Sequence, residues 1–305
     1  MAGDELLDNI QKWLSPPDPW KNFNIARESR HNETGAWFIK GNTLSEWKDS
    51  GPSSLLWING KRQLSHIAYI SGETDALIAA GAGKSVLWSV KLTIFFVFGT
   101  HSLVSSAIID EVKATQKSTL TSLAIFYYDF REDGKRHVLG LLSSVLFQLS
   151  DQSDSYYDVV SDFYSAHRNG AQSPSDDELA QCLMDLLKCP GPRPVCLVID
   201  ALDECPSTSS LSSPREKLLS LLEDLVEAQI PNLRICVTSR PEVDIKAILE
   251  PLAFRSISLH DESGQKEDIK KYIQSIVNAN KNMQNWNPEH KQLVIDVLTR
   301  KADGM

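Results

Sequence analysis

The chain has 305 residues, of which 42% are hydrophobic and 23% charged, a composition typical of a globular protein with a sizeable core. Its formal net charge of −9 argues against nucleic acid as the main partner, because a phosphate backbone requires a basic surface. The N-terminus lacks an apolar signal core, and the most hydrophobic run, Leu92–Phe98, is too short to span a bilayer. The five cysteines show no C-x-x-C spacing. We therefore expect a cytoplasmic protein with reduced thiols and no membrane or nucleic-acid partner.

The first 50 residues are rich in tryptophan and turn signals, and we interpret residues 1–50 as an N-terminal lead-in. Apolar residues at helical spacing over Asp4–Leu14 predict an amphipathic helix that ends before Pro16. Trp20, Trp37 and Trp47 then follow among turn residues. Aromatic side chains at such spacing are typical of packing against a neighbouring domain. A peptide-binding aromatic groove is the alternative.

The stretch Gly81–Ser85, with the sequence Gly-Ala-Gly-Lys-Ser, has the composition of a phosphate-binding loop. Glycines let backbone N–H groups approach phosphate oxygens, the lysine adds a positive charge, and the serine hydroxyl ligates Mg²⁺. The full pattern is G-x-x-x-x-G-K-[ST], and Ile78 stands where its first glycine belongs. The motif as written is therefore incomplete.

A glycine that completes the pattern stands at the end of the preceding apolar stretch, Leu55–Gly60, which predicts a strand. If Arg62–Ala79 is removed, Gly60 takes the first position of the pattern, directly behind that strand. We therefore interpret residues 62–79 as an insertion into a phosphate loop. The alternative is that Gly60 and Gly81 are unrelated turn glycines.

A second candidate insertion follows Ser85, where a helix with its N-terminus toward the phosphates should begin. Trp88–Val104 reads as strand-forming sequence with a glycine. If these seventeen residues are removed, Val86 and Leu87 join Ser105–Lys113 in one amphipathic helix. We therefore interpret residues 88–104 as a second insertion. Retained introns would explain both segments, and a spliced transcript that encodes them would contradict that explanation.

Strands and helices alternate along the rest of the chain. The predicted strands are Ser122–Asp129, Pro194–Asp200, Leu233–Val237 and Phe254–Leu259. The predicted helices are His137–Leu149, Tyr157–Ala166, Asp177–Leu187, Ser213–Ala228, Val243–Leu249, Glu267–Asn278 and Pro288–Lys301. This alternation, with a Gly-Lys-Ser loop first and an acid-tipped strand later, predicts an α/β fold of the P-loop NTPase type, a parallel sheet flanked by helices.

Three acids, Asp200, Asp203 and Glu204, stand at the end of the strand predicted over Pro194–Asp200. Its consecutive apolar residues indicate burial on both faces, and ligands bind at the carboxyl ends of such strands. Asp200 is therefore a candidate for holding Mg²⁺ through water, and Asp203 or Glu204 for orienting or deprotonating an attacking water. The alternative is that an aspartate caps the following helix.

Arg240 follows the next predicted strand, within Thr238–Pro241. An arginine at a strand tip beside a nucleotide can bind the terminal phosphate. The alternative is a surface arginine before a proline turn.

Taken together, Gly81–Ser85, Ile199–Cys205 and Thr238–Pro241 resemble the NACHT group of signal-transducing P-loop NTPases. More closely, they are similar to fungal-type proteins with a nephrocystin-like N-terminal domain, a family that Thr34–Phe38 and Phe126–Arg131 also match. The resemblance covers about residues 10–305 apart from the two candidate insertions.

The resemblance implies a nucleotide-driven switch of the STAND type, which binds ATP or GTP with Mg²⁺ and changes its oligomeric state. Its implied partners are nucleotide, further copies of itself and other signalling proteins. It also implies a NACHT-type P-loop NTPase domain over residues 51–260 and a truncated helical region over 261–305. The chain would then be a fragment of a larger multidomain protein.

The resemblance also implies roles for individual residues, carried over by motif position. These residues form three groups: those that bind phosphate, those that hold Mg²⁺ and those that position the hydrolytic water. The phosphates would be bound by Gly60, Gly81, Gly83 and Lys84, and the terminal phosphate sensed by Arg240. Mg²⁺ would be held by Ser85 and Asp200, and the hydrolytic water by Asp203 and Glu204.

Two alternatives to this switch stay open. The first is a degenerate, non-hydrolysing protein-interaction module, favoured by the split phosphate loop, because that loop binds phosphate only in one tight geometry. The second is a small-molecule or nucleotide kinase, since Gly-Lys-Ser loops also occur there. The acid pattern Asp200-x-x-Asp203-Glu204 favours the hydrolase-type switch over the kinase. We expect weak nucleotide binding and weaker hydrolysis from the chain with both insertions present.

Overall fold

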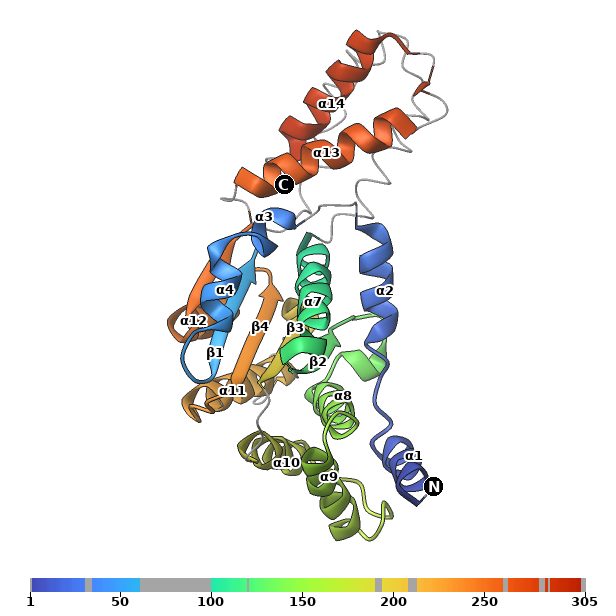
Figure 1. Cartoon of the computed structure of the whole chain (residues 1–305), viewed down its shortest axis with the longest axis vertical. Coiled ribbons are helices and arrows are strands. Elements are labelled where there is room, and N and C mark those ends of the chain that lie inside the picture. The colour runs from blue at the N-terminus through green and yellow to red at the C-terminus, as the bar shows by residue number, and fades with distance from the viewer. Residues whose placement is uncertain are drawn as a thin grey trace.

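The computed structural model describes residues 2–30, 35–60, 100–119, 121–189, 194–207, 213–259, 263–279, 283–284 and 286–302. Its centre is a five-stranded sheet in the order β2-β3-β4-β1-β5, and every pair of neighbours is parallel (Figure 1). The strands are β1 (Ser54–Asn59), β2 (Ser122–Tyr127), β3 (Val195–Asp200), β4 (Leu233–Ser239) and β5 (Arg255–Ser258). The predicted α/β fold with a parallel sheet is confirmed, and each predicted strand lies within a few residues of an observed one.

The sheet is buried on both faces, as the apolar runs in the strands predict. Every residue of β1, β2 and β3 is buried. Because side chains alternate along a strand, Leu55 and Trp57 enter one core cluster while Leu56 and Ile58 enter the other. The two clusters define the two helical layers of the domain.

One layer is formed by the helices that follow β2, β3 and β4, together with the N-terminal helix. These are α1 (Ala2–Leu14), α8 (Val138–Ser150), α9 (Asp154–Ala166), α10 (Asp176–Lys188), α11 (Pro214–Glu227) and α12 (Val243–Leu252). The helices predicted for these stretches are confirmed. Capping boxes at Ser175–Glu178 and Ser213–Glu216 fix the starts of α10 and α11.

The opposite layer contains α2 (Trp20–Ser29), α3 (Ala36–Ile39), α4 (Asn42–Lys48) and α7 (Thr100–Thr119). The first three helices were not predicted. Phe23, Phe38 and Trp47 are at most 2% exposed and pack with Leu56 of β1. These aromatic side chains therefore pack on the sheet, and residues 20–48 cover one of its faces.

Helix α7 corrects one expectation from the sequence. Residues 88–104 were expected to be strand-forming, but the last five of them, Thr100–Val104, are the first residues of α7. The physical reason is that Val104, Ile108 and Val112 recur every four residues and are all buried against the sheet. Residues 61–99 lie outside the described part of the chain, so segment 62–79 and the start of segment 88–104 are not placed.

The last two helices, α13 (Ser263–Ala279) and α14 (Pro288–Ala302), pack against each other. Figure 1 shows this pair beyond the end of the sheet toward which the strands point, next to α3. Both helices predicted in this region are confirmed. Among the described helices, none is long and apolar enough to cross a membrane.

Candidate functional site

The strand order places a topological switch point between β1 and β4. Helix α7, the first described helix after β1, covers one face of the sheet, and α12, which follows β4, covers the opposite face. In open parallel sheets, ligands bind in the crevice outside the carboxyl ends of the strands at such a point. Here Gly60 follows β1, and its backbone N–H donates to the carbonyl oxygen of Ser239 at the end of β4 (3.4 Å). Asp200 ends β3, which pairs with β4 on the side away from β1.

Asp200 is completely buried, and the chain supplies donors to both of its carboxylate oxygens. The hydroxyl of Thr238, on β4, donates to Oδ1 (2.6 Å), and the hydroxyl of Ser102, in the first turn of α7, donates to Oδ2 (2.5 Å). Burial raises the pKa of Asp200, and the hydroxyl donors Ser102, Thr238 and Ser105 oppose that rise. A buried carboxylate and a serine hydroxyl are both hard oxygen donors, so this pair suits Mg²⁺ chemically.

The chain turns sharply after Asp200 through a left-handed residue. Ala201 has φ 56° and ψ 44°, a conformation that is uncommon outside glycine. Its N–H donates to the hydroxyl of Thr238 (3.1 Å), and the carbonyl oxygen of Ala201 accepts from the N–H of Glu204 (2.9 Å). Completely buried Leu202 anchors the resulting single turn. The turn therefore presents Asp203 and Glu204 at the same edge as Asp200.

Asp203 and Arg240 are joined across the ends of β3 and β4. The backbone N–H of Arg240 donates to Oδ1 of Asp203 (3.0 Å), and its Nε lies 3.4 Å from Oδ2. The side chain of Asp203 is 7% exposed and that of Arg240 is 36% exposed. The Arg240 guanidinium is therefore held at the sheet edge by an acid, and its assignment as a sensor of the terminal phosphate stays a prediction.

Glu204 is bound less tightly than the other two acids. Its Oε2 accepts one hydrogen bond from the backbone N–H of Phe130 (3.2 Å). Burial raises the pKa of Glu204 to about 7, and the negative charges of Asp203, Asp129 and Asp200 add to the rise. A carboxyl group with a pKa near neutrality can accept and return a proton, as general acid–base chemistry requires.

Arg215, on the first turn of α11, holds the acid turn in place and was missed by the sequence analysis. It is 6% exposed, and it donates to the carbonyl oxygens of Cys205 (Nε, 2.9 Å) and Asp203 (Nη2, 2.6 Å). Its Nη1 pairs with Glu242 (2.6 Å) and Asp244 (3.2 Å) at the start of α12. The side chain of Arg215 therefore holds both the turn after β3 and the segment after Arg240.

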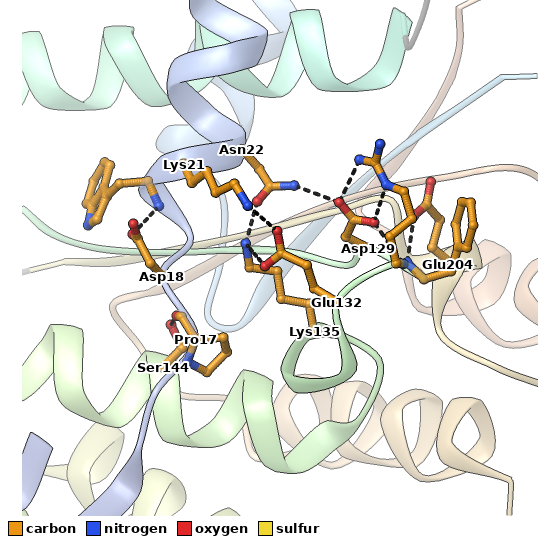
Figure 2. A network of polar contacts seen from close by, with 12 residues as sticks. Pro17, Asp18, Lys21, Asn22, Asp129, Glu132, Lys135, Ser144 and Glu204 are labelled. Carbon is orange, nitrogen blue, oxygen red and sulfur yellow. Dashed lines mark hydrogen bonds and ion pairs between the residues drawn. The ribbon is translucent and has the colours of Figure 1, made fainter. Parts of the chain in front are cut away.

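A polar network connects Glu204 to helix α2 through the loop after β2 (Figure 2). Lys135, only 1% exposed, lies 2.9 Å from Glu132 and donates to Oδ1 of Asn22 on α2. Glu132 also pairs with Lys21 (2.7 Å). The amide of Asn22 donates in turn to Asp129 (3.3 Å), one residue before the N–H that Glu204 accepts. The network fixes the loop that positions Glu204.

The structure brings together five of the residues predicted for the site: Gly60, Asp200, Asp203, Glu204 and Arg240. The other predicted residues, Gly81, Gly83, Lys84 and Ser85, lie outside the described residues. Within the described part of the chain, no three His, Cys, Asp or Glu side chains converge as a metal cluster. Asp200 Oδ2 and Ser102 Oγ bring two oxygen atoms to within 2.5 Å of each other at this edge.

Comparison with known proteins gives one match to a protein family. No curated protein matches the chain. Residues 100–240 match the family described as Nephrocystin 3, N-terminal. The matched segment begins with the first residue of α7 and ends at Arg240, so Ser102, Asp200, Asp203 and Glu204 all lie within it. The part of the chain that contains Asp200, Asp203 and Glu204 is thus similar to the N-terminal domain of nephrocystin 3.

Proposed function

We propose that this chain is a NACHT-type molecular switch that binds ATP or GTP with Mg²⁺ at the carboxyl edge of the sheet and serves signal transduction. The observation that carries the proposal is Asp200, a completely buried carboxylate at the end of β3 with a helix-borne hydroxyl 2.5 Å away. A carboxylate at a strand end facing a serine at a helix start is the pair that P-loop NTPases use for Mg²⁺. Lys84, with Gly60, Gly81 and Gly83, would bind the phosphates.

The environments of the acids suggest a division of work between them. Glu204, with a pKa raised to about 7, suits the role of base for the attacking water. Asp203 pairs with Arg240 and would hold that guanidinium toward the terminal phosphate. The family match supports the proposal only for residues 100–240, and nucleotide binding rests on the residues themselves. The NTPase domain over 51–260, signalling partners and self-association belong to the same proposal.

A second candidate, a non-hydrolysing interaction module with a disrupted phosphate loop, is favoured by a different observation. Both oxygens of Asp200 already accept hydrogen bonds from the chain's own hydroxyls. The Asp203 carboxylate likewise already pairs with Arg240. A protein that uses this edge only as a scaffold would need no ligand there, because its polar groups satisfy one another.

Titration with fluorescent ATP and GTP in the presence of Mg²⁺ tests the proposal. Three proteins are compared: the whole chain, the same chain with Asp200→Asn, and a shortened chain without residues 62–79 and 88–104. We expect saturable binding by the whole chain, weaker than by the shortened chain, and at least a tenfold loss with Asp200→Asn. Lys84→Ala in the shortened chain should also abolish binding.

The outcomes separate the two candidates. Binding that depends on Asp200 supports the switch, and size-exclusion chromatography with and without nucleotide then tests the change in oligomeric state. If neither the whole nor the shortened chain binds either nucleotide while both remain folded by circular dichroism, the switch is rejected and the interaction module replaces it.

A further inference from the structure

The helix-borne hydroxyl that donates to Asp200 belongs to Ser102, although the phosphate-loop motif places its serine at Ser85. Ser102 Oγ lies 2.5 Å from Oδ2 of Asp200, at the end of β3. It stands seventeen residues after Ser85 in the chain. The structure therefore puts a serine from outside the motif in the place where the motif's serine is needed.

The two serines occupy equivalent positions in two similar stretches of sequence. The five residues directly before Ser105, residues 100–104, are Thr-His-Ser-Leu-Val. If residues 88–104 were absent, the five residues directly before Ser105 would be residues 83–87, Gly-Lys-Ser-Val-Leu. Both stretches have a basic residue, then serine, then two aliphatic residues. Ser102 consequently has the helical position that Ser85 would have in the shortened chain.

The register of α7 is fixed by contacts along its length. Val104, Ile108 and Val112 are buried against the sheet, and rotating the helix by one residue would move all three off that face. On another side of α7, Asp110 pairs with Arg30 (2.5 Å). Ser105, completely buried one turn after Ser102, donates to the carbonyl oxygen of Ser102 (3.0 Å). Ser102 is therefore held opposite Asp200 by the helix as a whole.

We infer that Ser102, and not Ser85, is the hydroxyl that ligates the nucleotide-bound divalent cation together with Asp200. The inference rests on the proposed function, since the cation arrives with the nucleotide. Mg²⁺ in such sites takes one or two protein oxygens and completes its shell with phosphates and water. Ser102 and Asp200 supply two adjacent oxygens of that kind. The match to the nephrocystin-type family, which begins at Thr100, includes Ser102 and leaves Ser85 outside.

The test is a metal-specificity experiment on the whole chain with cysteine in place of each serine. A thiolate binds a soft cation better than a hard one, so cysteine at a ligand position should weaken binding with Mg²⁺ and restore it with Cd²⁺. We expect Ser102→Cys to lose at least tenfold in affinity for fluorescent ATP with Mg²⁺ and to recover most of it with Cd²⁺. Ser85→Cys should behave as the unchanged protein with either cation.

Two further variants separate ligation from folding. Ser102→Thr keeps a hydroxyl and should keep Mg²⁺-dependent binding. Ser150→Ala removes the hydroxyl of another helical serine, which is buried and donates to the carbonyl oxygen of Phe147 (2.8 Å), so this variant should bind nucleotide as the unchanged protein does with either cation. The unchanged protein with Cd²⁺ controls for its five native cysteines.

The possible results have distinct meanings, including for a poorly folding variant. Cd²⁺ rescue at Ser85 instead of Ser102 overturns the inference and leaves the proposed function standing. Loss with Ser102→Cys that Cd²⁺ does not restore, with retention in Ser102→Thr, also overturns ligation by Ser102. Failure of the unchanged and the shortened protein to bind nucleotide with either cation rejects the proposed function itself.

Discussion

Two neighbouring segments at the carboxyl edge of the sheet shift the pKa values of their acids in opposite directions. In the loop after β2, residues 129–135, the side chain of Asp129 is 5% exposed, yet its pKa is lowered to about 2, chiefly by hydrogen bonds from the Arg131 guanidinium. In the turn after β3, residues 200–205, Glu204 accepts one backbone N–H, and burial raises its pKa to about 7. The two segments touch through Phe130, so position along the edge does not explain the difference.

The difference follows from where the cations are. The β2 loop contains Arg131 and Lys135 and contacts Lys21, so each of its carboxylates has a cationic partner. In the β3 turn, the side chain of Arg240 is directed to Asp203, which leaves Asp200 and Glu204 with neutral donors only. Where the environment of a site separates the pKa values of two carboxyl groups, one group stays ionised and the other can take up and release a proton. Asp129 is therefore structural, and Glu204 remains available to exchange a proton.

The largest expected effect is in the β3 turn, from Arg215→Met. The substitution leaves two backbone carbonyls without their donor and removes both pairs to α12, so we expect a loss of about 3 kcal/mol in the free energy of unfolding. Glu242 and Asp244 are partly exposed and can be rehydrated, which limits the loss. Urea denaturation followed by circular dichroism measures it.

Lys217→Met is the matched control on the same helix. Lys217 is 47% exposed and pairs with Asp176 at the surface (2.9 Å), so its removal should change stability by less than about 0.5 kcal/mol. Equal losses from the two variants would show that Arg215 does not anchor the turn.

Glu204→Gln tests the raised pKa in the same turn. An acid whose pKa rises from 4.5 in the unfolded chain to about 7 in the folded protein stabilises the fold below pH 4.5, and this contribution disappears as the pH rises to 7. Glutamine does not titrate and can still accept from Phe130. The variant should match the unchanged protein at pH 4.5 and exceed it by about 2 kcal/mol at pH 8, after allowance for partial solvent screening. Parallel urea curves across this range would contradict a raised pKa.

In the β2 loop, the two lysines that share Glu132 should differ. Lys135 is 1% exposed and Lys21 is 61% exposed. Lys135→Met should cost about 1.5 kcal/mol, because methionine fills the space but leaves Asn22 without its donor, whereas Glu132 keeps Lys21 and water. Lys21→Met should cost clearly less than Lys135→Met, because solvent screens the exposed Lys21–Glu132 pair. Thermal or urea unfolding measures the stability of both variants. A larger loss of stability from Lys21→Met than from Lys135→Met would contradict the structural role of the buried lysine.

The sequence predicted the framework of this edge because the framework depends on local pattern. Apolar runs gave the strands, and the carboxyl ends of those strands located Asp200, Asp203, Glu204 and Arg240 correctly. Helices α2 to α4 were missed because prolines and polar residues obscure their short apolar faces. One signal was present: Asp18, just before α2, accepts from the N–H of Trp20 (2.8 Å), a hydrogen bond typical of an aspartate turn.

The supporting residues could not be predicted because their roles depend on contacts far apart in sequence. Lys135 reaches Asn22 across 113 positions, and Ser102 reaches Asp200 across 98. No periodicity indicates such contacts. For Ser102, the similarity between residues 84–87 and 101–104 is visible in the sequence, but only the position of α7 shows that Ser102 faces Asp200.

The smallest expected effect is the pH dependence of Asp129→Asn. An acid whose pKa falls from 3.8 to about 2 on folding stabilises the protein above pH 3.8, and this contribution is lost as the pH falls toward 2. Arg131 is 73% exposed, so solvent screening should reduce the effect to about 1 kcal/mol. Urea denaturation should therefore show the variant less stable than the unchanged protein at pH 6, with the gap narrowing at pH 3. The sign of this difference is opposite to the one expected for Glu204→Gln, which becomes more stable than the unchanged protein as the pH rises from 4.5. If both variants became more stable, or both less stable, relative to the unchanged protein as the pH rises, the two segments would not shift the pKa values of their acids in opposite directions.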